Sequence, residues 1–413
     1  MRHSFWRIRA FARPTLGSNS GCDAAAGHST SRPRSSRRIA LALNFAAIAV
    51  FADLYVPQPI LPMLSAQFGV SAGTGGLTIS VTVLMIAGIS AAYGFMSDIL
   101  GRKPVMVAAC VLLALPTFLC AFAPTFQVLL LFRALQGLLM PGVTAVAVAY
   151  LGDHYAGAEL GPRVGGWIAA SVAGGLTGRV GSGLIASWIH WRAPFIVFGA
   201  WTLVAAWALG RILPQQQATQ RVQLSLAYRG MFSHFRNRRL VGSFLIGGTL
   251  FFTAIGVFTY LPYYLAAPPF LLSTAIVSSI YLVYLAGVAT SLITGRLTRN
   301  ASGRLVMGVG LAVAALGVLT TEIKSLPAVL IGLVVLCVGM FTAQSTAPAF
   351  VNSNAKGAKG GAGSLYTSFY YLGASLGSAL PGYALQVWGW GGVVGTCIAM
   401  LVIGLLADLV LCR

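Results

Sequence analysis

Long apolar stretches separated by short polar segments run through almost the whole chain. Twelve of them are long enough to form membrane-spanning helices, because about 20 apolar residues cross the hydrocarbon core at 1.5 Å per residue. Several connections are only a few residues long, so neighbouring helices are expected to run antiparallel. The expected spans are residues 39–62, 73–94, 104–123, 126–151, 163–187, 192–213, 240–265, 273–295, 304–321, 326–351, 361–387 and 390–411.

The composition supports this all-α membrane protein and argues against a soluble one. The chain has 413 residues, of which 57% are hydrophobic and only 8% are charged, whereas soluble domains carry about 25% charged residues. The net charge of +20 would suggest a nucleic-acid partner in a soluble protein. Here the basic residues lie in tails and loops between apolar spans, so we expect a lipid bilayer and no nucleic acid as partner.

The distribution of Lys and Arg predicts the orientation in the membrane. Outside the spans, basic residues gather in the N-terminal tail and in the connections on the same side, and only Arg192 and Lys324 fall on the other side. Arg133 and Arg179 lie within spans. Because cytoplasmic segments carry the excess of basic residues, both termini are predicted to be cytoplasmic.

Two polar segments divide the chain into domains. Residues 1–38 are rich in Arg and Ser, lack an apolar core like that of a signal peptide, and are predicted to be a disordered basic cytoplasmic tail. This tail could bind anionic headgroups, or it could come from an over-extended start site. Residues 214–239 are predicted to be a cytoplasmic linker between an N-terminal six-helix bundle, 39–213, and a C-terminal six-helix bundle, 240–413.

The two bundles are expected to be pseudo-symmetric, because three local patterns recur at an offset near 200 residues. Leu61-Pro62 followed by Ser71 matches Leu261-Pro262 followed by Ser273. Gly94 with Gly101-Arg102 matches Gly295 with Gly303-Arg304. A run of spaced glycines in the fifth span (Gly174, Gly178, Gly183) matches one in the eleventh (Gly373, Gly377, Gly382). A parallel repeat of this kind places the substrate site between the bundles, near mid-membrane.

The order of these motifs resembles the twelve-span drug:proton antiporter branch of the major facilitator superfamily. The matching motifs are the charged turn Gly94–Lys103, the Asp53-Leu54-Tyr55-Val56-Pro57 element, Arg133-Ala134-Leu135-Gln136-Gly137 and the spaced glycines of the fifth span. The fifth span departs from the branch at Gly178-Arg179, where Gly-Pro is usual. The resemblance implies a bacterial inner-membrane transporter, expected to be a monomer, that works by rocking two bundles around a central site.

Asp53 is the acid that lies well inside a predicted span, and burying a carboxylate in a bilayer is costly enough to suggest a function. Our hypothesis is that Asp53 takes up and releases the coupling proton while Arg133 changes partners. The alternative is a static ion pair that holds the first and fourth spans together.

Arg179 lies at a similar depth to Asp53 and Arg133. One acid cannot neutralise two arginines, so Arg179 could give the cavity a positive potential that suits an anionic substrate. Alternatively, it bonds to carbonyl groups at a glycine-rich kink or extends toward the membrane surface.

The resemblance implies that Gly94, Asp98, Gly101, Arg102 and Lys103 form a gating loop in which Asp98 clamps the end of a neighbouring helix. The alternative is a solvated loop that carries orientation charges. The glycines of spans five and eleven are interpreted as sites of close helix packing.

Further polar and aromatic side chains are candidates for the substrate cavity. They are Gln58, Gln136, Arg179, Tyr263, Tyr284, Gln344 and Tyr370. For the glutamines an interhelical hydrogen bond is the alternative, and for the tyrosines it is packing or anchoring at the membrane interface.

No motif for an enzyme, a metal or a cofactor is present. The six cysteines form no Cys-x-x-Cys pair, the histidines have no metal-ligand spacing, and no phosphate-binding loop is found. The prediction is therefore a secondary active transporter that exports small organic molecules, drug-like compounds or metabolites, in exchange for protons. The alternatives are an organic anion or sugar exporter or exchanger, and a non-transporting membrane sensor with the same fold.

Overall fold

The computed structural model describes residues 33–215, 233–297, 302–355 and 359–413, and all regular structure in these ranges is helical. Eleven helical segments in the described part are long and apolar enough to cross a membrane. The last of them, Gly360–Leu411, has 52 residues. At 1.5 Å per residue it would be nearly 80 Å long, more than twice the thickness of the hydrocarbon core.

This last segment is two spans joined by a sharp turn. Within α15 (Lys359–Leu411), Gly389 adopts φ 61° and ψ −151°, a conformation that L side chains rarely adopt, and the helix folds back there. The eleven segments therefore comprise twelve spans, as the apolar pattern predicts.

The N-terminal half consists of spans one to six. Its elements are α1 (Pro33–Tyr55), η1 (Gln58–Ile60) and α2 (Leu61–Phe68) in the first span, then α3 (Ala72–Leu100), α4 (Arg102–Ala121), α5 (Phe126–Leu139) with α6 (Pro141–His154), η2 (Gly157–Glu159) with α7 (Leu160–Trp188), and α8 (Ala193–Ile212).

The C-terminal half repeats the arrangement. Its elements are η3 (His234–Arg236), α10 (Arg238–Ala266), α11 (Thr274–Ile280) with η4 (Tyr281–Val283) and α12 (Tyr284–Leu297), α13 (Gly303–Thr320), α14 (Leu326–Asn354) and the two spans of α15. Ser71 and Ser273, paired in the sequence repeat, occupy the N-cap positions of α3 and α11.

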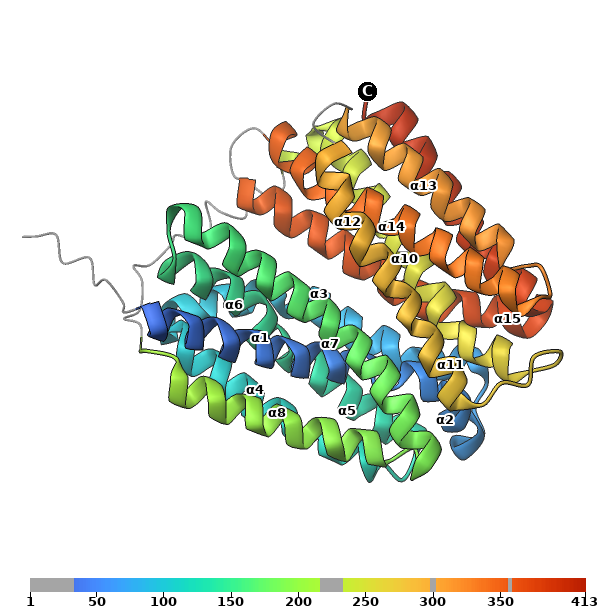
Figure 1. Ribbon diagram of the computed structural model, residues 1–413, viewed down its shortest axis with the longest axis horizontal. Helices are drawn as coiled ribbons and strands as arrows, with labels where there is room; N and C mark the ends of the chain where they lie inside the picture. Colours follow the sequence, from blue (N-terminus) through green and yellow to red (C-terminus); the bar gives the residue numbers. More distant parts are fainter. Residues whose placement is uncertain (1–32, 216–232, 298–301, 356–358) are drawn as a thin grey trace, which may run out of the picture.

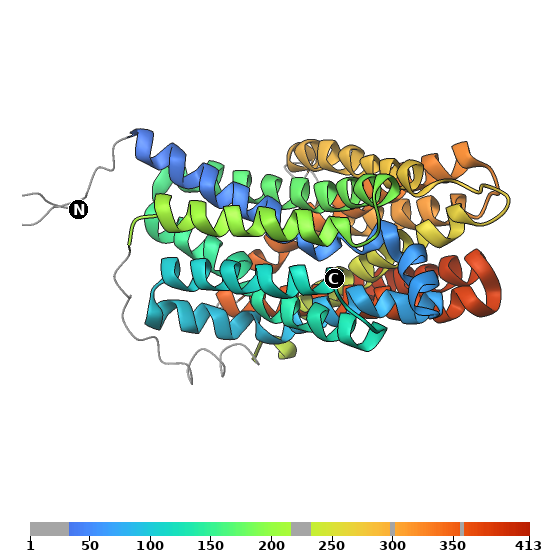
Figure 2. The same cartoon turned by 90° about the horizontal axis from the view of Figure 1, so that it is seen from below.

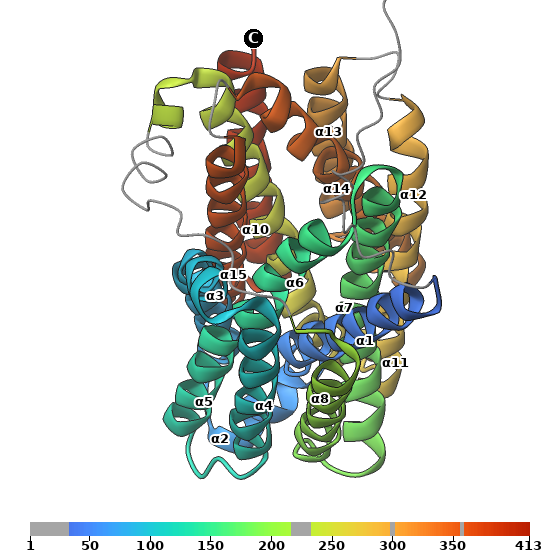
Figure 3. The same cartoon turned by 90° about the vertical axis from the view of Figure 1, so that its left-hand side faces the viewer.

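The two halves converge near α2 and α11 and diverge toward the C-terminus and the start of α1 (Figure 1). Seen from below, helices of both halves run along the same long axis of the molecule (Figure 2). In the end-on view most of the N-terminal half, blue to green, lies below most of the C-terminal half, yellow to red, and the two overlap in the middle of the picture (Figure 3). In each half the first span packs along the fifth: α1 on α7, and α10 on α15.

Proline interrupts the first span of each half and frees a backbone carbonyl. Pro57 has no N–H for the carbonyl of Asp53 four residues earlier, and Pro262 has none for that of Phe258. The second carbonyl accepts a hydrogen bond from the Tyr281 hydroxyl at 2.8 Å. The partner of the first carbonyl is part of the candidate site.

Several predicted boundaries shift. The tail predicted over 1–38 gives way to helix at Pro33, while 1–32 lie outside the described residues. The linker predicted over 214–239 already contains η3 and the start of α10 in its described part. The gating loop is not a loop: α3 continues to Leu100 and α4 begins at Arg102, because Gly101 alone, at φ 89°, provides the turn.

Candidate functional site

Asp53 lies in the last turn of α1 with 1% of its surface exposed. Oδ2 accepts a hydrogen bond from the Thr202 hydroxyl of α8 at 2.8 Å, and the Thr117 hydroxyl of α4 lies 3.4 Å away. Within the described residues, Oδ1 has no hydrogen-bond partner. The carboxyl group is thus held by hydroxyls, which can donate to a carboxylate or accept from a carboxylic acid.

Arg133 is fully buried in α5 and binds the end of α1 through backbone carbonyls. Nη1 donates to the Asp53 carbonyl at 3.0 Å, and Nη2 donates to the Leu54 carbonyl at 2.8 Å. Nε donates to the Thr78 carbonyl of α3 at 3.0 Å. The guanidinium therefore replaces the helical donor that Pro57 removes and ties three spans together.

The side chains of Asp53 and Arg133 communicate through two intermediates. Nη1 of Arg133 donates to Gln136 Oε1 at 2.6 Å, and Gln136 Nε2 donates to Thr117 Oγ1 at 2.7 Å. The ion pairs in the described part of the chain join Arg102 and Arg304 to other acids, and none joins Asp53 to an arginine. The static ion pair considered from the sequence is therefore absent in this conformation.

A central cavity of about 530 Å³ lies between the halves. A neighbouring hollow of about 810 Å³ shares several of its lining residues. Four candidates for the substrate cavity line the central cavity: Arg179, Tyr284, Gln344 and Tyr370. The last three also line the neighbouring hollow. Gln344 Nε2 donates to the Tyr370 hydroxyl at 2.5 Å.

The other three candidates lie away from the cavity lining. Gln136 belongs to the Asp53 cluster. Gln58 Nε2 donates to Thr259 Oγ1 at 2.9 Å, across the contact between the halves. The Tyr263 hydroxyl lies 2.6 Å from Ser65 Oγ, also across that contact. Gln58 and Tyr263 therefore join the bundles in this conformation.

The cavity is closed on one side and continues toward the other. We call the side that carries Arg37, Arg102 and Arg304 the basic end. Hydrogen bonds between the halves lie in the middle of the molecule and at the opposite end, for example Ser80 with Ser375 at 3.0 Å and Gln386 to Ser71 at 2.9 Å.

A further hollow of about 590 Å³ reaches helix ends on the basic side. It shares Ser90 and Thr144 with the central cavity and is also lined by Asn352 and Gly360, which lie at the end of α14 and the start of α15. The conformation is therefore open toward the basic end.

The residues of the predicted gate form a cluster of charges at the basic end. Arg102 lies 3.5 Å from Asp98, across the Gly101 turn between α3 and α4, and also pairs with Asp153 of α6. Among the described residues, Asp98 contacts Arg102 and not the N-terminus of a neighbouring helix. Lys103 Nζ donates to the Leu213 carbonyl at the end of α8, at 2.5 Å. Gly94 lies inside α3 with open space beside it.

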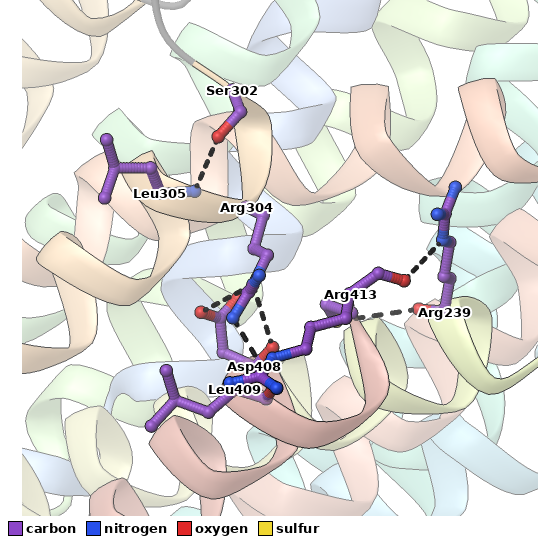
Figure 4. Close-up of polar contacts among 8 residues, drawn as sticks. Arg239, Ser302, Arg304, Leu305, Asp408, Leu409 and Arg413 are labelled. Carbon is purple, nitrogen blue, oxygen red and sulfur yellow. Dashed lines mark hydrogen bonds and ion pairs between the residues drawn. The ribbon is translucent and has the colours of Figure 1, made fainter.

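The C-terminal half repeats the contact that Lys103 makes. Arg304, in the first turn of α13, donates through Nε to the Asp408 carbonyl at 3.2 Å and through Nη2 to the Leu409 carbonyl at 3.4 Å (Figure 4). Its Nε also lies 3.7 Å from Asp408 Oδ2. In each half, a cation at the start of the third span binds the last carbonyls of the sixth.

The glycines of spans five and eleven lie at close helix contacts. A Cβ at Gly174 or Gly178 would collide with the backbone of α1, at Ile48 or Ala52. The pseudo-equivalent Gly373 and Gly377 meet the backbone of α10 at Gly248 and Phe252 in the same way.

The third glycine of each set lies between the halves. A Cβ at Gly183 would overlap Ser278 of α11 in the other half. A Cβ at Gly382 would overlap Gly73 of α3 in the other half and the Tyr260 hydroxyl of its own half. Gly183 is thus restricted mainly by the partner half, whereas Gly382 is restricted by both halves.

Several residues of the site carry no signal in the sequence. Thr117 and Thr202 are ordinary hydroxyls within apolar runs, and only the fold brings both to Asp53. Asp153 and Asp408 stand near predicted span ends, where acids are common. Asp408 is nevertheless 4% exposed, so Asp53 is not alone as a buried acid.

Comparison with known proteins gives a consistent result. The sequence profile of the Major Facilitator Superfamily matches residues 43–356. The inner membrane transport protein YnfM of Escherichia coli (strain K12) is 34% identical over 371 residues, 89% of either chain. The MFS-type transporter YybF of Bacillus subtilis (strain 168) is 30% identical over 371 residues, 89% of this chain and 92% of YybF.

Solved structures share the fold at low sequence identity. A bacterial homologue of the human lysosomal transporter Spinster, in an inward-facing and unoccupied conformation, matches with a TM-score of 0.74 and 16% identity, covering 92% of this chain and 95% of that one. The nucleoside transporter NupG matches with a TM-score of 0.73 and 15% identity, covering 91% and 100%. The chain therefore belongs to the Major Facilitator Superfamily, as a multi-pass membrane protein of the transporter class.

Proposed function

We propose that this protein is a secondary transporter that exports small organic molecules in exchange for protons, by alternating access of the central cavity. The observation that carries the proposal is the state of Asp53, a buried carboxyl group that has no ion-pair partner, and one oxygen without a hydrogen bond, among the residues that the structure describes.

A proton on Asp53 would remove the free-energy cost of burying its negative charge. A carboxylate buried at low dielectric without a paired cation is unfavourable, and protonation removes that charge. Oδ1, which accepts no hydrogen bond within the described residues, can carry the proton, while the Thr202 hydroxyl continues to donate to Oδ2. Asp53 can therefore exist in two protonation states without rebuilding its surroundings.

Coupling to transport would act through α1. Asp53 and Tyr55 lie two residues apart, and Tyr55 lines the cavity while Asp53 does not. Arg133 fixes the carbonyls of Asp53 and Leu54, so a change at the carboxyl group is transmitted to the same turn of helix. Arg133 would act by holding this turn, with partner exchange through Gln136 and Thr117 during the cycle.

The basic end is proposed to face the cytoplasm, with both termini on that side, in a bacterial inner membrane. The excess of Lys and Arg on that side supports the orientation, and YnfM is described as an inner membrane protein. In this orientation the structure is inward-open, and the charge cluster of Asp98, Arg102 and Asp153 belongs to the cytoplasmic gate. We expect the transporter to act as a monomer.

Everted membrane vesicles test the proposal. Respiration acidifies their lumen, and an acridine orange signal reports the gradient. We expect a transported compound, found in a panel of aromatic cations, neutral compounds and acids, to dissipate the gradient in vesicles with the wild-type protein and not in vesicles with Asp53→Asn.

Glu322→Gln is the matched control, because Glu322 is an exposed acid at the opposite end. It should behave as the wild type does. If no compound in a wide panel moves with the gradient, the sensor alternative is favoured. A gradient that collapses equally with Asp53→Asn would contradict the role of Asp53.

A further inference from the structure

Arg179 is a buried cation that faces the central cavity. It lies in α7 with 4% of its surface exposed and is part of the cavity lining. Nε donates to Gln58 Oε1 at 2.5 Å, and Nη1 donates to the Gly175 carbonyl at 3.0 Å. Both alternatives drawn from the sequence, a carbonyl contact and a cavity position, therefore apply together.

Aromatic rings surround the guanidinium without neutralising it. Its central carbon lies 3.6 Å from the ring centre of Tyr55, 4.8 Å from that of Tyr284 and 5.7 Å from that of Tyr281. Cation–π contacts act within about 6 Å. They stabilise the charge and hold the guanidinium in one orientation, but they leave its full positive charge in place.

No acid among the described residues compensates this charge. The ion pairs in that part of the chain involve Arg102 and Arg304, and Asp53 is bound by hydroxyls. Arginine has five N–H donors, and the bonds above use two of them. Neither of these two bonds uses Nη2, so its N–H donors remain for a bidentate acceptor.

The rest of the cavity is mostly apolar and aromatic, with the Gln344 amide and a few Ser and Thr hydroxyls among its lining residues. Its walls include Trp167, Phe251, Phe341, Tyr370 and Tyr371. The volume of about 530 Å³ is that of a site for a small organic molecule. Flat rings on several walls suit an aromatic body, which can stack on them. A second charge on the ligand would face these apolar walls without a partner.

With the cavity taken as the substrate site of the proposed exporter, we propose that it binds aromatic monocarboxylates, with the carboxylate on Arg179 and the ring against the aromatic walls. A carboxylate supplies the negative charge that no acid among the described residues provides to Arg179. Two parallel N–H···O bonds fix the orientation of the ligand. Neutral analogues lose the charge interaction, and cations are repelled.

The direct test compares an acid with its amide on the purified wild-type protein. The probes are 1-naphthoate, 1-naphthamide and 1-naphthylmethylamine, and binding is measured by isothermal titration in detergent without a pH gradient. We expect 1-naphthoate to bind at least about tenfold more tightly than the amide, since charge-assisted hydrogen bonds contribute on that scale, and the amine to bind most weakly. Amide binding equal to acid binding, or no binding of the acid, would overturn the proposal.

Variants then assign the preference to Arg179. Arg179→Gln should bind acid and amide alike, and Arg179→Lys should keep part of the preference. Arg192→Gln is the control, because Arg192 also lies over an aromatic ring, 4.4 Å from that of Trp191, but outside the cavity lining. Arg179→Gln that keeps the full preference would contradict the assignment.

The binding titration tests the ligand preference of Arg179 independently of proton exchange. The titration needs no proton gradient, so acid-selective binding that depends on Arg179 stands even if the vesicle assay finds no proton exchange. Should Arg179→Gln fail to fold, the wild-type comparison and Arg179→Lys still decide the question.

Discussion

Arg133 donates a hydrogen bond to the backbone carbonyl of Asp53, at 3.0 Å, and not to its carboxylate. The carbonyl needs this donor because Pro57, four residues later, has no N–H. From the sequence, Asp53 and Arg133 look like an ion pair. In the structure, Arg133 instead donates to the backbone carbonyl that lacks its helical N–H donor. The carboxyl group is left to the hydroxyls of Thr202 and Thr117, which tolerate either protonation state.

The first prediction separates the stability effects of Arg133 and Asp53. Arg133→Gln should lower the thermal unfolding temperature, because it orphans up to three carbonyls at about 1–3 kcal/mol each. Asp53→Asn should leave that temperature unchanged or raise it, since it removes a buried charge and keeps the shape. Thermal unfolding in detergent measures both. Equal losses for the two variants would indicate a charge pair instead.

The second prediction concerns Pro57. Its φ of −70° and ψ of −24° suit other residues, so Pro57→Ala could supply the missing N–H to the Asp53 carbonyl. In the Arg133→Gln background, Pro57→Ala should recover on the order of 1 kcal/mol of stability, as coupling between neighbouring sites allows. The double-mutant cycle is measured by chemical or thermal unfolding. Strict additivity of the two changes would argue against the shared carbonyl.

The third prediction tests the glycine contacts. Gly178→Ala should push α7 away from α1, and Gly377→Ala should push α15 away from α10, because the added methyl group meets backbone atoms. Both changes should lower stability and transport. Gly395→Ala is the control, since a Cβ there has open space. It should be neutral or slightly stabilising in the helix. Equal tolerance at all three positions would show that the helices are not in contact there.

The fourth prediction is an asymmetry at the pair of Arg304 and Asp408, whose side chains are 30% and 6% exposed. Arg304→Gln leaves a buried carboxylate without its cation, whereas Asp408→Asn leaves an arginine that water still reaches. Removing one partner of a buried pair costs most when the remaining charge is the buried one. Arg304→Gln should therefore unfold at the lower temperature of the two. The reverse order would mean that Asp408 is not held as a charged group.

The apolar pattern predicts the fold well because span length and hydrophobicity are set by the bilayer itself. The twelve spans follow, and the repeat leads to the matched contacts of Gly174 and Gly178 on α1 and of Gly373 and Gly377 on α10. The short turn at Gly101 is less accessible to this reasoning, because polar residues such as Asp98 can lie on a helix that extends beyond the membrane.

The chemistry of the site is less predictable than the fold. The sequence marks Asp53, Arg133 and Arg179 as costly groups, but their partners come from the three-dimensional packing. Thr117 and Thr202 resemble many other hydroxyl residues in apolar spans. The group that Arg133 binds is a backbone carbonyl, which every residue has, so the sequence does not mark it. Gln58 is a cavity candidate by its depth in the membrane, and Tyr263 is one as part of the aromatic cluster of the second half. Hydrogen bonds across the halves place both side chains in the contact between the bundles.

Proton release on ligand binding tests the central claim most directly. A ligand from the transport panel is added to purified protein in weakly buffered detergent solution near neutral pH, and a pH-sensitive dye reports protons. The wild-type protein is predicted to release protons as it binds, whereas Asp53→Asn should bind the same ligand and release none. Proton release from Asp53→Asn equal to that of the wild type would contradict the account.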